Sequence, residues 1–317
     1  MKIGVIGTGN MGGALMDAFC KDAENTMVAC NHGKEKLEAV CQRTGAVLTI
    51  LHMGRNCDLD LTQLGQLLER DTALVAVTWV SNVLGTVNPV GEITMMSHAA
   101  GAMTVIDGAQ AMKLPEIDVT AVDCDFLTFS GHKLGALTGI GVLYGKNNIL
   151  SQLPPVRFGG GMIRESQYAA SSYGGVPQRF EAGTPNYVGA ISLGCAMEYL
   201  QSVGRIELAQ REWSLTDLLR KELAAIPEVT VIGTPNRCCD VVSFVVPDIH
   251  PFDLGAMLDS QGIAVRTGHL CAQPLVNQLG YDSVIRVSPA FYNTEQEILG
   301  FISALKRTIP LLKGEWT

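Results

Sequence analysis

Apolar residues along the chain fall into two alternating patterns. Continuous runs of strand length are separated by longer segments in which apolar residues recur at helical spacing. The runs predict strands at Val47–Leu51, Ala73–Trp79, Met103–Ile106, Asp125–Phe129 and Gly139–Tyr144. The helical segments between them include Leu61–Leu68 and Ile93–Ala100. Strands that alternate with helices predict an α/β fold whose central sheet is mainly parallel and covered on both faces.

The last third of the chain has a mixed α+β pattern. Helical spacing predicts helices at Leu193–Val203, Ile206–Ile226 and near Asp253–Ser260. Short apolar runs predict strands at Val229–Ile232, Val241–Val246 and Ala264–Arg266. A Gly-rich polar stretch, residues 158–186, precedes them and is expected to be a long functional loop. We therefore expect a large domain over residues 46–200 and a smaller C-terminal α+β domain over residues 201–317.

The first 45 residues predict a separate Rossmann-like β-α-β-α segment. Its strands are expected at Lys2–Gly7 and Thr26–Cys30, and its helices at Met11–Cys20 and Lys34–Arg43. Gly7, Gly9 and Gly12 fit GxGxxG after the first strand, where helix N–H groups can face a phosphate. The acidic residue expected after the second strand is absent, and the residues in its place are Asn31, His32 and Lys34. These would suit a 2′-phosphate, which makes NADP(H) a candidate ligand.

Composition narrows the class of protein. Hydrophobic residues make up 47% of the 317 residues and charged residues 17%, which excludes a disordered chain. The net charge of −8 argues against nucleic acid or an anionic membrane as the main partner. No apolar run approaches the ~20 residues of a membrane-spanning helix. The nine cysteines show no paired metal-ligand spacing, so we expect a cytoplasmic enzyme with reduced thiols and no metal.

Polar motifs follow the predicted strands, where open α/β sheets place ligands. Asp107 ends one strand, Lys133 follows another, and the segment RTGHLCA occupies residues 266–272. Pyridoxal phosphate (PLP) needs a lysine for its Schiff base and an acid that keeps its pyridine nitrogen protonated as an electron sink. Taken singly, Asp107 could cap a helix and Lys133 could be a solvated loop residue. The three motifs in order favour a PLP site.

Five segments between about residue 43 and the C-terminus carry a resemblance to a known family: VSNVLGT, IDGAQA, FSGHKLGALTGIGVLYGK, RFEAGTPN and RTGHLCAQP. They resemble the class V aminotransferases, specifically the cysteine desulfurases of the Suf type and close relatives such as selenocysteine lyase. The resemblance implies the PLP-dependent transferase fold of type I. It also implies conversion of L-cysteine into L-alanine, with a persulfide left on Cys271 for iron–sulfur cluster assembly.

The same resemblance implies cofactor contacts on one subunit. Lys133 would form the Schiff base and shuttle the substrate proton, and Asp107 would pair with the pyridine nitrogen. Gln110 would bond the phenolic oxygen of the cofactor, with Asn82 nearby.

Phosphate binding is implied for Ser130 and His132, and His132 is placed with Lys133 among the catalytic residues. Thr184 would reach the phosphate of the neighbouring subunit, which implies a homodimer.

Substrate contacts are implied for residues near the C-terminus. Arg286 would clamp the substrate carboxylate through its planar guanidinium. Cys271 would be the nucleophile, and Arg266 and His269 are candidates for keeping its thiol partly ionised. The family usually has a second histidine in place of Leu270. A sulfur-acceptor protein is an implied partner.

The N-terminus resembles a different family. The segment MKIGVIGTGNMGGALMDAF, continued by KEKLEAV, is similar to the start of pyrroline-5-carboxylate reductase. It stands where complete desulfurases have a Gly-Thr-Thr phosphate turn, so we expect Gly7, Thr8 and Gly9 to bind the PLP phosphate instead. The alternative is a fused or truncated, weakly active class V aminotransferase-like protein whose N-terminal segment binds NADP(H).

Overall fold

The computed structural model describes residues 2–6, 27–30, 47–54, 56–68 and 72–314. The predicted helices at Met11–Cys20 and Lys34–Arg43 lie outside these residues, as do Gly7, Thr8 and Gly9. The two predicted strands flanking the first of these helices are present and pair in parallel, with Val5 opposite Ala29.

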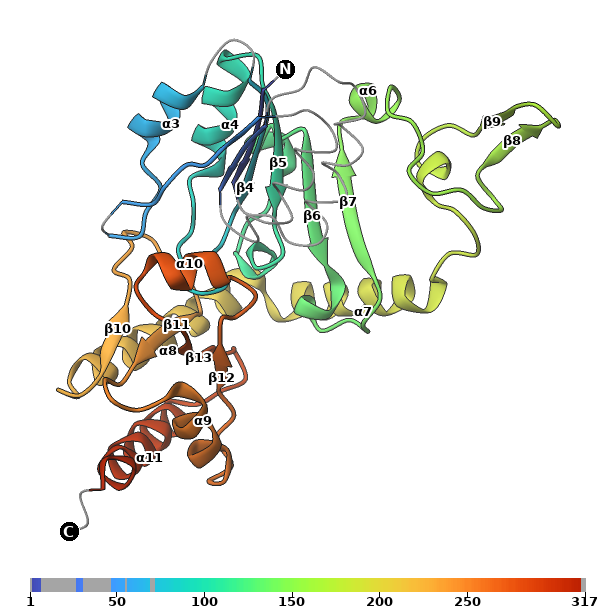
Figure 1. Ribbon diagram of the computed structural model, residues 1–317. Helices are drawn as coiled ribbons and strands as arrows, with labels where there is room; N and C mark the ends of the chain where they lie inside the picture. The colour runs from blue at the N-terminus through green and yellow to red at the C-terminus, as the bar shows by residue number, and fades with distance from the viewer. Residues whose placement is uncertain (1, 7–26, 31–46, 55, 69–71, 315–317) are drawn as a thin grey trace.

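A seven-stranded sheet organises the first half of the chain (Figure 1). Its strands are β1 (Lys2–Ile6), β2 (Met27–Cys30), β3 (Leu48–Thr49), β4 (Thr72–Thr78), β5 (Met103–Asp107), β6 (Phe126–Ser130) and β7 (Gly141–Gly145), in the order β1-β3-β2-β4-β5-β6-β7. The neighbours β4, β5 and β6 run parallel, whereas β7 is antiparallel to β6. The predicted mainly parallel sheet is therefore confirmed, with an antiparallel strand at its edge.

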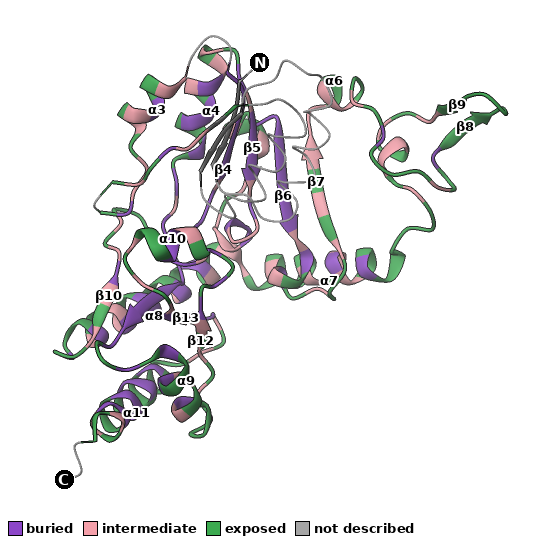
Figure 2. Cartoon of the chain, in the orientation of Figure 1, coloured by how far each residue is buried: buried purple, intermediate pink, exposed green. Residues whose placement is uncertain are grey.

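Burial explains why the sheet strands are continuous apolar runs. The five apolar residues 73–77 of β4 are all buried, because helices and loops cover both sheet faces (Figure 2). Covering elements are α3 (Leu61–Leu67) and α4 (Val90–Ala99), with the short η1 (Ala111–Lys113), α5 (Val119–Val122), η2 (Gly131–Leu134) and α6 (Asn147–Leu150) at the strand ends. Leu64 and Ile93 pack from α3 and α4 into the core that contains Val75 and Val77.

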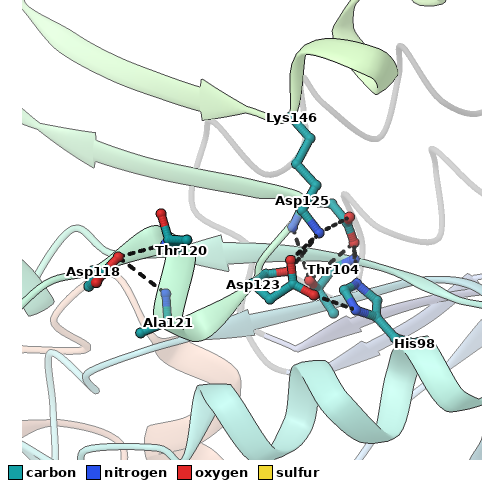
Figure 3. Close-up of polar contacts among 8 residues, drawn as sticks. All are labelled: His98, Thr104, Asp118, Thr120, Ala121, Asp123, Asp125 and Lys146. Carbon is teal, nitrogen blue, oxygen red and sulfur yellow. Dashed lines mark hydrogen bonds and ion pairs between the residues drawn. The ribbon is translucent and has the colours of Figure 1, made fainter.

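A network of polar contacts closes the amino end of β6 (Figure 3). Asp125, just before β6, accepts hydrogen bonds from His98 Nε2 at 2.8 Å and from the backbone N–H of Thr104 at 2.7 Å. Its other oxygen lies 3.2 Å from Lys146 Nζ, and Asp123 also pairs with Lys146 at 2.7 Å. Each oxygen of the buried Asp125 carboxylate therefore has a donor.

The stretch expected to be a long loop contains a small hairpin. Strands β8 (Ile163–Ser166) and β9 (Ser171–Tyr173) pair in antiparallel fashion, and η3 (Gln178–Phe180) follows. The hairpin projects away from the main body, and its residues are mostly exposed (Figures 1 and 2).

The C-terminal part forms a smaller α+β unit, as predicted. An antiparallel sheet in the order β10-β11-β13-β12 packs against three helices, with Phe244 and Phe301 in its core. Helix α7 (Tyr187–Val203) packs into the core of the large sheet through Leu193 and leads into the smaller unit. The elements of the smaller unit are α8 (Arg205–Ala224), β10 (Thr230–Ile232), β11 (Val242–Val245), α9 (Pro251–Asp259), β12 (Arg266–Gly268), α10 (Gln273–Gln278), β13 (Val284–Val287) and α11 (Glu295–Lys313). The strand expected at Ala264–Arg266 was placed too early, because the paired residues begin at Arg266.

The loop after β4 joins the two sheets. Gly85 has φ +69°, and a Cβ there would lie 2.8 Å from the carbonyl oxygen of Val241. The backbone N–H of Cys239 donates to the Gly85 carbonyl at 2.9 Å. Glycine is required at this position both for its φ and for the close approach. The contact holds the carboxyl end of β4 against the start of β11.

None of the helices in the described residues is long and apolar enough to cross a membrane. The same residues also contain no group of three or more His, Cys, Asp or Glu side chains arranged to hold a metal ion.

Candidate active site

The carboxyl ends of three neighbouring strands bring the predicted residues to one edge of the large sheet. Strand register places Thr78 of β4 opposite Asp107 of β5, and Asp107 opposite Thr128 of β6. The segment that follows β4 carries Asn82, and the segment that follows β6 carries Lys133. Parallel strands end at the same edge, so residues distant in sequence meet there.

Asp107 is the last residue of β5, and its carboxyl group is only partly satisfied. Its Oδ1 accepts a hydrogen bond from the backbone N–H of Ala109 at 2.9 Å. Burial raises the pKa of Asp107, while this hydrogen bond and the charge of Lys133 oppose the rise. Within the described residues, Oδ2 has no hydrogen-bond donor.

Lys133 lies on η2, directly after β6, and faces a mixture of charges. Burial lowers the pKa of Lys133, as do the charges of Arg286 and Lys113, whereas Asp107 and Cys271 raise it. Among the described residues, its ammonium group has no hydrogen bond or ion pair. A desolvated lysine of this kind loses its proton more readily than a surface lysine.

The predicted phosphate ligands are placed unevenly. Ser130 Oγ and His132 Nδ1 lie 2.8 Å apart at the end of β6. Thr184 is exposed in the segment before α7 and has no hydrogen bond within the described part of the chain. Gln110 is half-buried just before η1, and its side chain makes no hydrogen bond to the described residues. The structure thus pairs Ser130 with His132 and leaves Thr184 and Gln110 unpaired.

Two arginines from the smaller sheet face this edge. Arg266 of β12 and Arg286 of β13 are directly opposite each other in the antiparallel ladder. Burial lowers the pKa of Arg286, and the charge of Arg266 lowers it further. Like charges directly opposite one another are unfavourable unless an anion joins them.

The guanidinium of Arg286 is held at one nitrogen and free at another. Its Nη1 donates to the backbone carbonyl of Asn82 at 3.0 Å. Its Nε is buried and has no hydrogen-bond partner among the residues that the structure describes. A buried donor without an acceptor is costly, so this atom is suited to an anionic ligand such as a carboxylate.

Cys271 sits on the turn between β12 and α10, with its side chain exposed. It is close enough to Lys133 and Arg286 for its charge to raise the pKa of both. His269 is exposed two residues earlier. The structure therefore gathers Asp107, Lys133, Arg266, Arg286 and Cys271, which come from the two sheets and span residues 107–286 of the sequence.

Sequence reasoning missed a buried group of charges beside this edge. Lys113 at the end of η1 forms an ion pair with Asp240, just before β11. Glu212 of α8 is also buried, and its Oε1 accepts from the backbone N–H of Phe291 at 3.1 Å. Burial raises the pKa of Glu212 to about 7, helped by Asp240 and opposed by Lys113. The burial of Glu212 was visible in the sequence, because Glu212 lies at helical spacing with the apolar residues Leu215 and Leu219.

A cavity of about 610 Å³ adjoins η2. Helices α7 and α8 and the segment 290–292 form its other walls, and Glu212 is among its polar lining residues. Of the predicted site residues, only His132 and Lys133 line it. The cavity lies beside the gathered residues and does not contain Cys271 or Arg286.

Proteins with sequences similar to this chain include cysteine desulfurases. A cysteine desulfurase from Enterobacter sp. (strain 638) is 45% identical over 276 residues, which cover 87% of this chain and 68% of the relative. One from Dickeya dadantii is 44% identical, over 87% of this chain and 67% of the relative. Homology to cysteine desulfurases, expected from the sequence, is thus confirmed.

Solved structures give the same result for the fold. The cysteine desulfurase CsdA from Escherichia coli superposes with a TM-score of 0.88 at 30% identity, over 95% of this chain and 78% of that one. The apo cysteine desulfurase from Thermococcus onnurineus NA1 gives 0.89 at 31% identity, over 95% and 76%. These matches confirm the predicted type I fold of PLP-dependent transferases.

A family model covers most of the chain. The model for class-V aminotransferases matches residues 21–301, and this match begins inside the segment 1–45 that resembles a reductase. Together with the identity to the cysteine desulfurases and the gathered lysine, aspartate and arginine, this extent of match shows that the chain belongs to the class V aminotransferase family.

Proposed function

We propose that the protein is a PLP-dependent cysteine desulfurase that converts L-cysteine into L-alanine and retains the sulfur as a persulfide on Cys271. The observation that carries this proposal is the meeting of Lys133, Asp107, Arg286 and Cys271 at one sheet edge. A lysine, an acid, a carboxylate clamp and a thiol are the four groups that such a reaction requires.

The residues at the edge fit the cofactor. Asp107 has a carboxyl oxygen with no hydrogen-bond donor among the described residues, suited to a protonated ring nitrogen. Lys133 is desolvated and unpaired there, suited to a covalent bond with an aldehyde. Ser130 and His132 would hold the phosphate, and Gln110 the phenolic oxygen. When bound, PLP supplies an electron sink that stabilises negative charge on the substrate α-carbon.

Lys133 is the group that moves the substrate proton. Because burial lowers the pKa of its ammonium, the neutral amine needed to accept a proton is more accessible than on a surface lysine. General base catalysis by a positioned side chain contributes roughly 10²- to 10⁴-fold in rate.

Arg286 and Arg266 bind the substrate carboxylate. Arg286 is already oriented by its hydrogen bond to Asn82, so little side-chain freedom remains to be lost on binding. A carboxylate between the two guanidinium groups would satisfy the unpaired Nε and relieve their repulsion.

Cys271 takes up the sulfur. Its thiolate attacks the substrate sulfur, a new S–S bond forms, and the bond between that sulfur and the substrate β-carbon breaks. The electron pair stays with the carbon, which is protonated to the methyl group of alanine. Carbon is reduced as sulfur is oxidised, so no external oxidant or reductant is needed. His269 and Arg266 lie close by in sequence and would favour the thiolate.

The proposal also includes a homodimer, a protein that accepts the sulfur, and a cytoplasmic location. The side chains of Tyr187, Val188 and Ile191 on α7 are apolar and mostly exposed, which supports a homodimer in which Thr184 reaches the partner's phosphate site. As in a desulfurase of the Suf type, the exposed Cys271 would pass its sulfur to an acceptor protein. Six cysteines within the described residues are free thiols, which supports a reducing, cytoplasmic setting.

Three domains are proposed, over residues 1–45, 46–200 and 201–317. The two sheets, each with its own apolar core, support the boundary near residue 200. Gly7, Thr8 and Gly9 remain the proposed N-terminal phosphate turn, in the segment that resembles pyrroline-5-carboxylate reductase.

The test is turnover of L-cysteine by the PLP-loaded chain. We expect alanine and sulfide in equal amounts when a reducing thiol is present. Cys271→Ala should abolish both products while the cofactor remains bound. Alanine release that continues in Cys271→Ala would contradict the persulfide route, and a wild-type chain that binds PLP but releases no alanine would contradict the function.

A further inference from the structure

The turn that carries Cys271 has an unusual backbone. Leu270 and Cys271 have φ +54° and +62°, and Gly268, two residues before, has φ +106°. Only glycine adopts this region readily, because a Cβ crowds the backbone there. Two consecutive side-chain-bearing residues in this conformation persist only when their surroundings hold them.

Contacts on both sides of the turn hold it. Leu270 is buried against Val83 and Leu84 from the loop after β4. The Asn82 side chain, from the same loop, donates from Nδ2 to the carbonyl oxygen of Leu270 at 2.5 Å. This hydrogen bond joins residues that are 188 positions apart in the sequence, and it holds the backbone of the turn.

Asn82 is itself fixed by its neighbours. The hydroxyl of Ser81 accepts from the backbone N–H groups of Val83 at 3.3 Å and Leu84 at 3.2 Å. Ser243 of β11 donates to the carbonyl of Val83 at 2.5 Å. The loop that presents Asn82 is therefore anchored to the smaller sheet.

Asn82 thus contacts both the turn that carries the nucleophile and the arginine that would bind the substrate carboxylate. The Asn82 side chain holds the turn of Cys271, and its backbone carbonyl accepts from Arg286 Nη1 at 3.0 Å. We propose that Asn82 is a positioning residue that fixes the nucleophile turn at a set distance from the carboxylate clamp. The proposal rests on the proposed function, because it assumes that Cys271 and Arg286 act on one substrate.

Loss of the Asn82 side chain should have different effects if Asn82 positions the turn than if it binds the cofactor or the substrate. Asn82→Ala and Asn82→Asp remove the donor to Leu270 but leave the backbone carbonyl that holds Arg286. Release of the turn should lower kcat about 10- to 100-fold, because misplacing a reacting group by an ångström has effects of that size. KM for L-cysteine and the PLP absorption spectrum should stay near those of the wild type.

Hydrogen–deuterium exchange of the PLP-loaded full chain gives a readout that does not depend on turnover. The backbone N–H of Ala272 donates to the backbone carbonyl oxygen of His269 at 2.8 Å, across the turn. In both variants we expect peptides covering residues 268–273 to exchange about tenfold faster, the effect of losing one such hydrogen bond. Peptides from α11 should not change, which distinguishes a local release from general unfolding.

Asn236→Ala is the matched control, since Asn236 also makes a long-range side-chain hydrogen bond, to Asp58 at 2.6 Å, but on the exposed surface. It should alter neither kcat nor exchange in the turn. A raised KM or a shifted PLP spectrum in the Asn82 variants, with exchange of residues 268–273 unchanged, would overturn the proposal and make Asn82 a ligand. If the wild type lacks desulfurase activity, accelerated exchange would still support the anchoring role.

Discussion

The amino end of strand β6 and the carboxyl end of its parallel neighbour β5 hold acidic residues in opposite states. At the amino end, Asp125 is buried and accepts from His98, Thr104 and Lys146, so each of its oxygens is satisfied (Figure 3). At the carboxyl end, Asp107 of the neighbouring strand has one backbone donor, and Lys133 lacks a partner among the described residues.

The difference separates a structural cluster from a binding site. Buried polar groups in folded proteins are normally paired, so a fully paired set needs nothing further to be stable. A set that is desolvated and partly unpaired has a pKa shift at each group and accepts an outside ligand. Arg286, whose buried Nε has no partner in the described part of the chain, belongs to the second kind.

The largest expected effect is on turnover. Lys133→Ala should reduce alanine production by at least about 10³-fold, because the chain loses both its covalent cofactor link and its general base. Lys146→Ala, from the amino-end cluster, is the control and should leave turnover unchanged. Equal losses in the two variants, measured with folded protein and saturating PLP, would show that the lysines at the two ends do not differ in role.

The amino-end cluster should respond in stability. Asp125→Asn places an amide among donors and removes a buried charge from its cationic partners, so the free energy of unfolding should fall by about 3 kcal/mol. Urea denaturation measures this change. Asp123→Asn should have little effect, because that carboxylate is exposed and its ion pairs are screened by solvent. A stable Asp125→Asn variant would contradict a structural role for the cluster.

Glu212 offers a pH test at the carboxyl side of the sheet. Its folded pKa of about 7 lies above its usual value of 4.5, so its contribution to stability is full below pH 4.5 and is lost as the pH rises through about 7. Over that window the wild type should lose roughly 2–3 kcal/mol relative to Glu212→Gln. Urea midpoints at several pH values give the difference. Parallel pH profiles of the two proteins would show that Glu212 is ionised as in water.

The smallest effect concerns Asp107 in cofactor-free protein. Because burial raises the pKa of Asp107, its favourable contribution is present at low pH and is lost as the pH rises through the folded pKa. Asp107→Asn should therefore raise the urea midpoint of the cofactor-free chain at neutral pH. A lower midpoint would mean that the carboxylate is already satisfied, like that of Asp125.

The sequence predicted the large sheet better than the smaller one. Parallel strands covered on both faces are continuous apolar runs, as in β4 and β5, and such runs are visible without an alignment. The antiparallel direction of β7 could not be predicted, because an apolar run does not indicate strand direction. The predictions contained neither β13 nor α11, although Thr294 and Glu297 form a capping box that marks the start of α11.

The site was predictable to the extent that its residues stand in motifs. Lys133 and Asp107 follow apolar runs, and the resemblance pointed to Cys271 and Arg286. The role of Asn82 at the nucleophile turn could not be predicted, because its hydrogen bond to Leu270 joins segments 188 residues apart. The pairing of Lys113 with Asp240 depends in the same way on how the two sheets pack.

Covalent attachment of the cofactor tests the contrast between the two ends most directly. The full chain would be incubated with PLP, treated with borohydride, digested and analysed by mass spectrometry. We expect the reduced cofactor on Lys133, which has no partner among the described residues, and not on the ion-paired Lys113 or Lys146. Attachment to Lys113 or Lys146 in place of Lys133, or no attachment at all, would contradict this expectation.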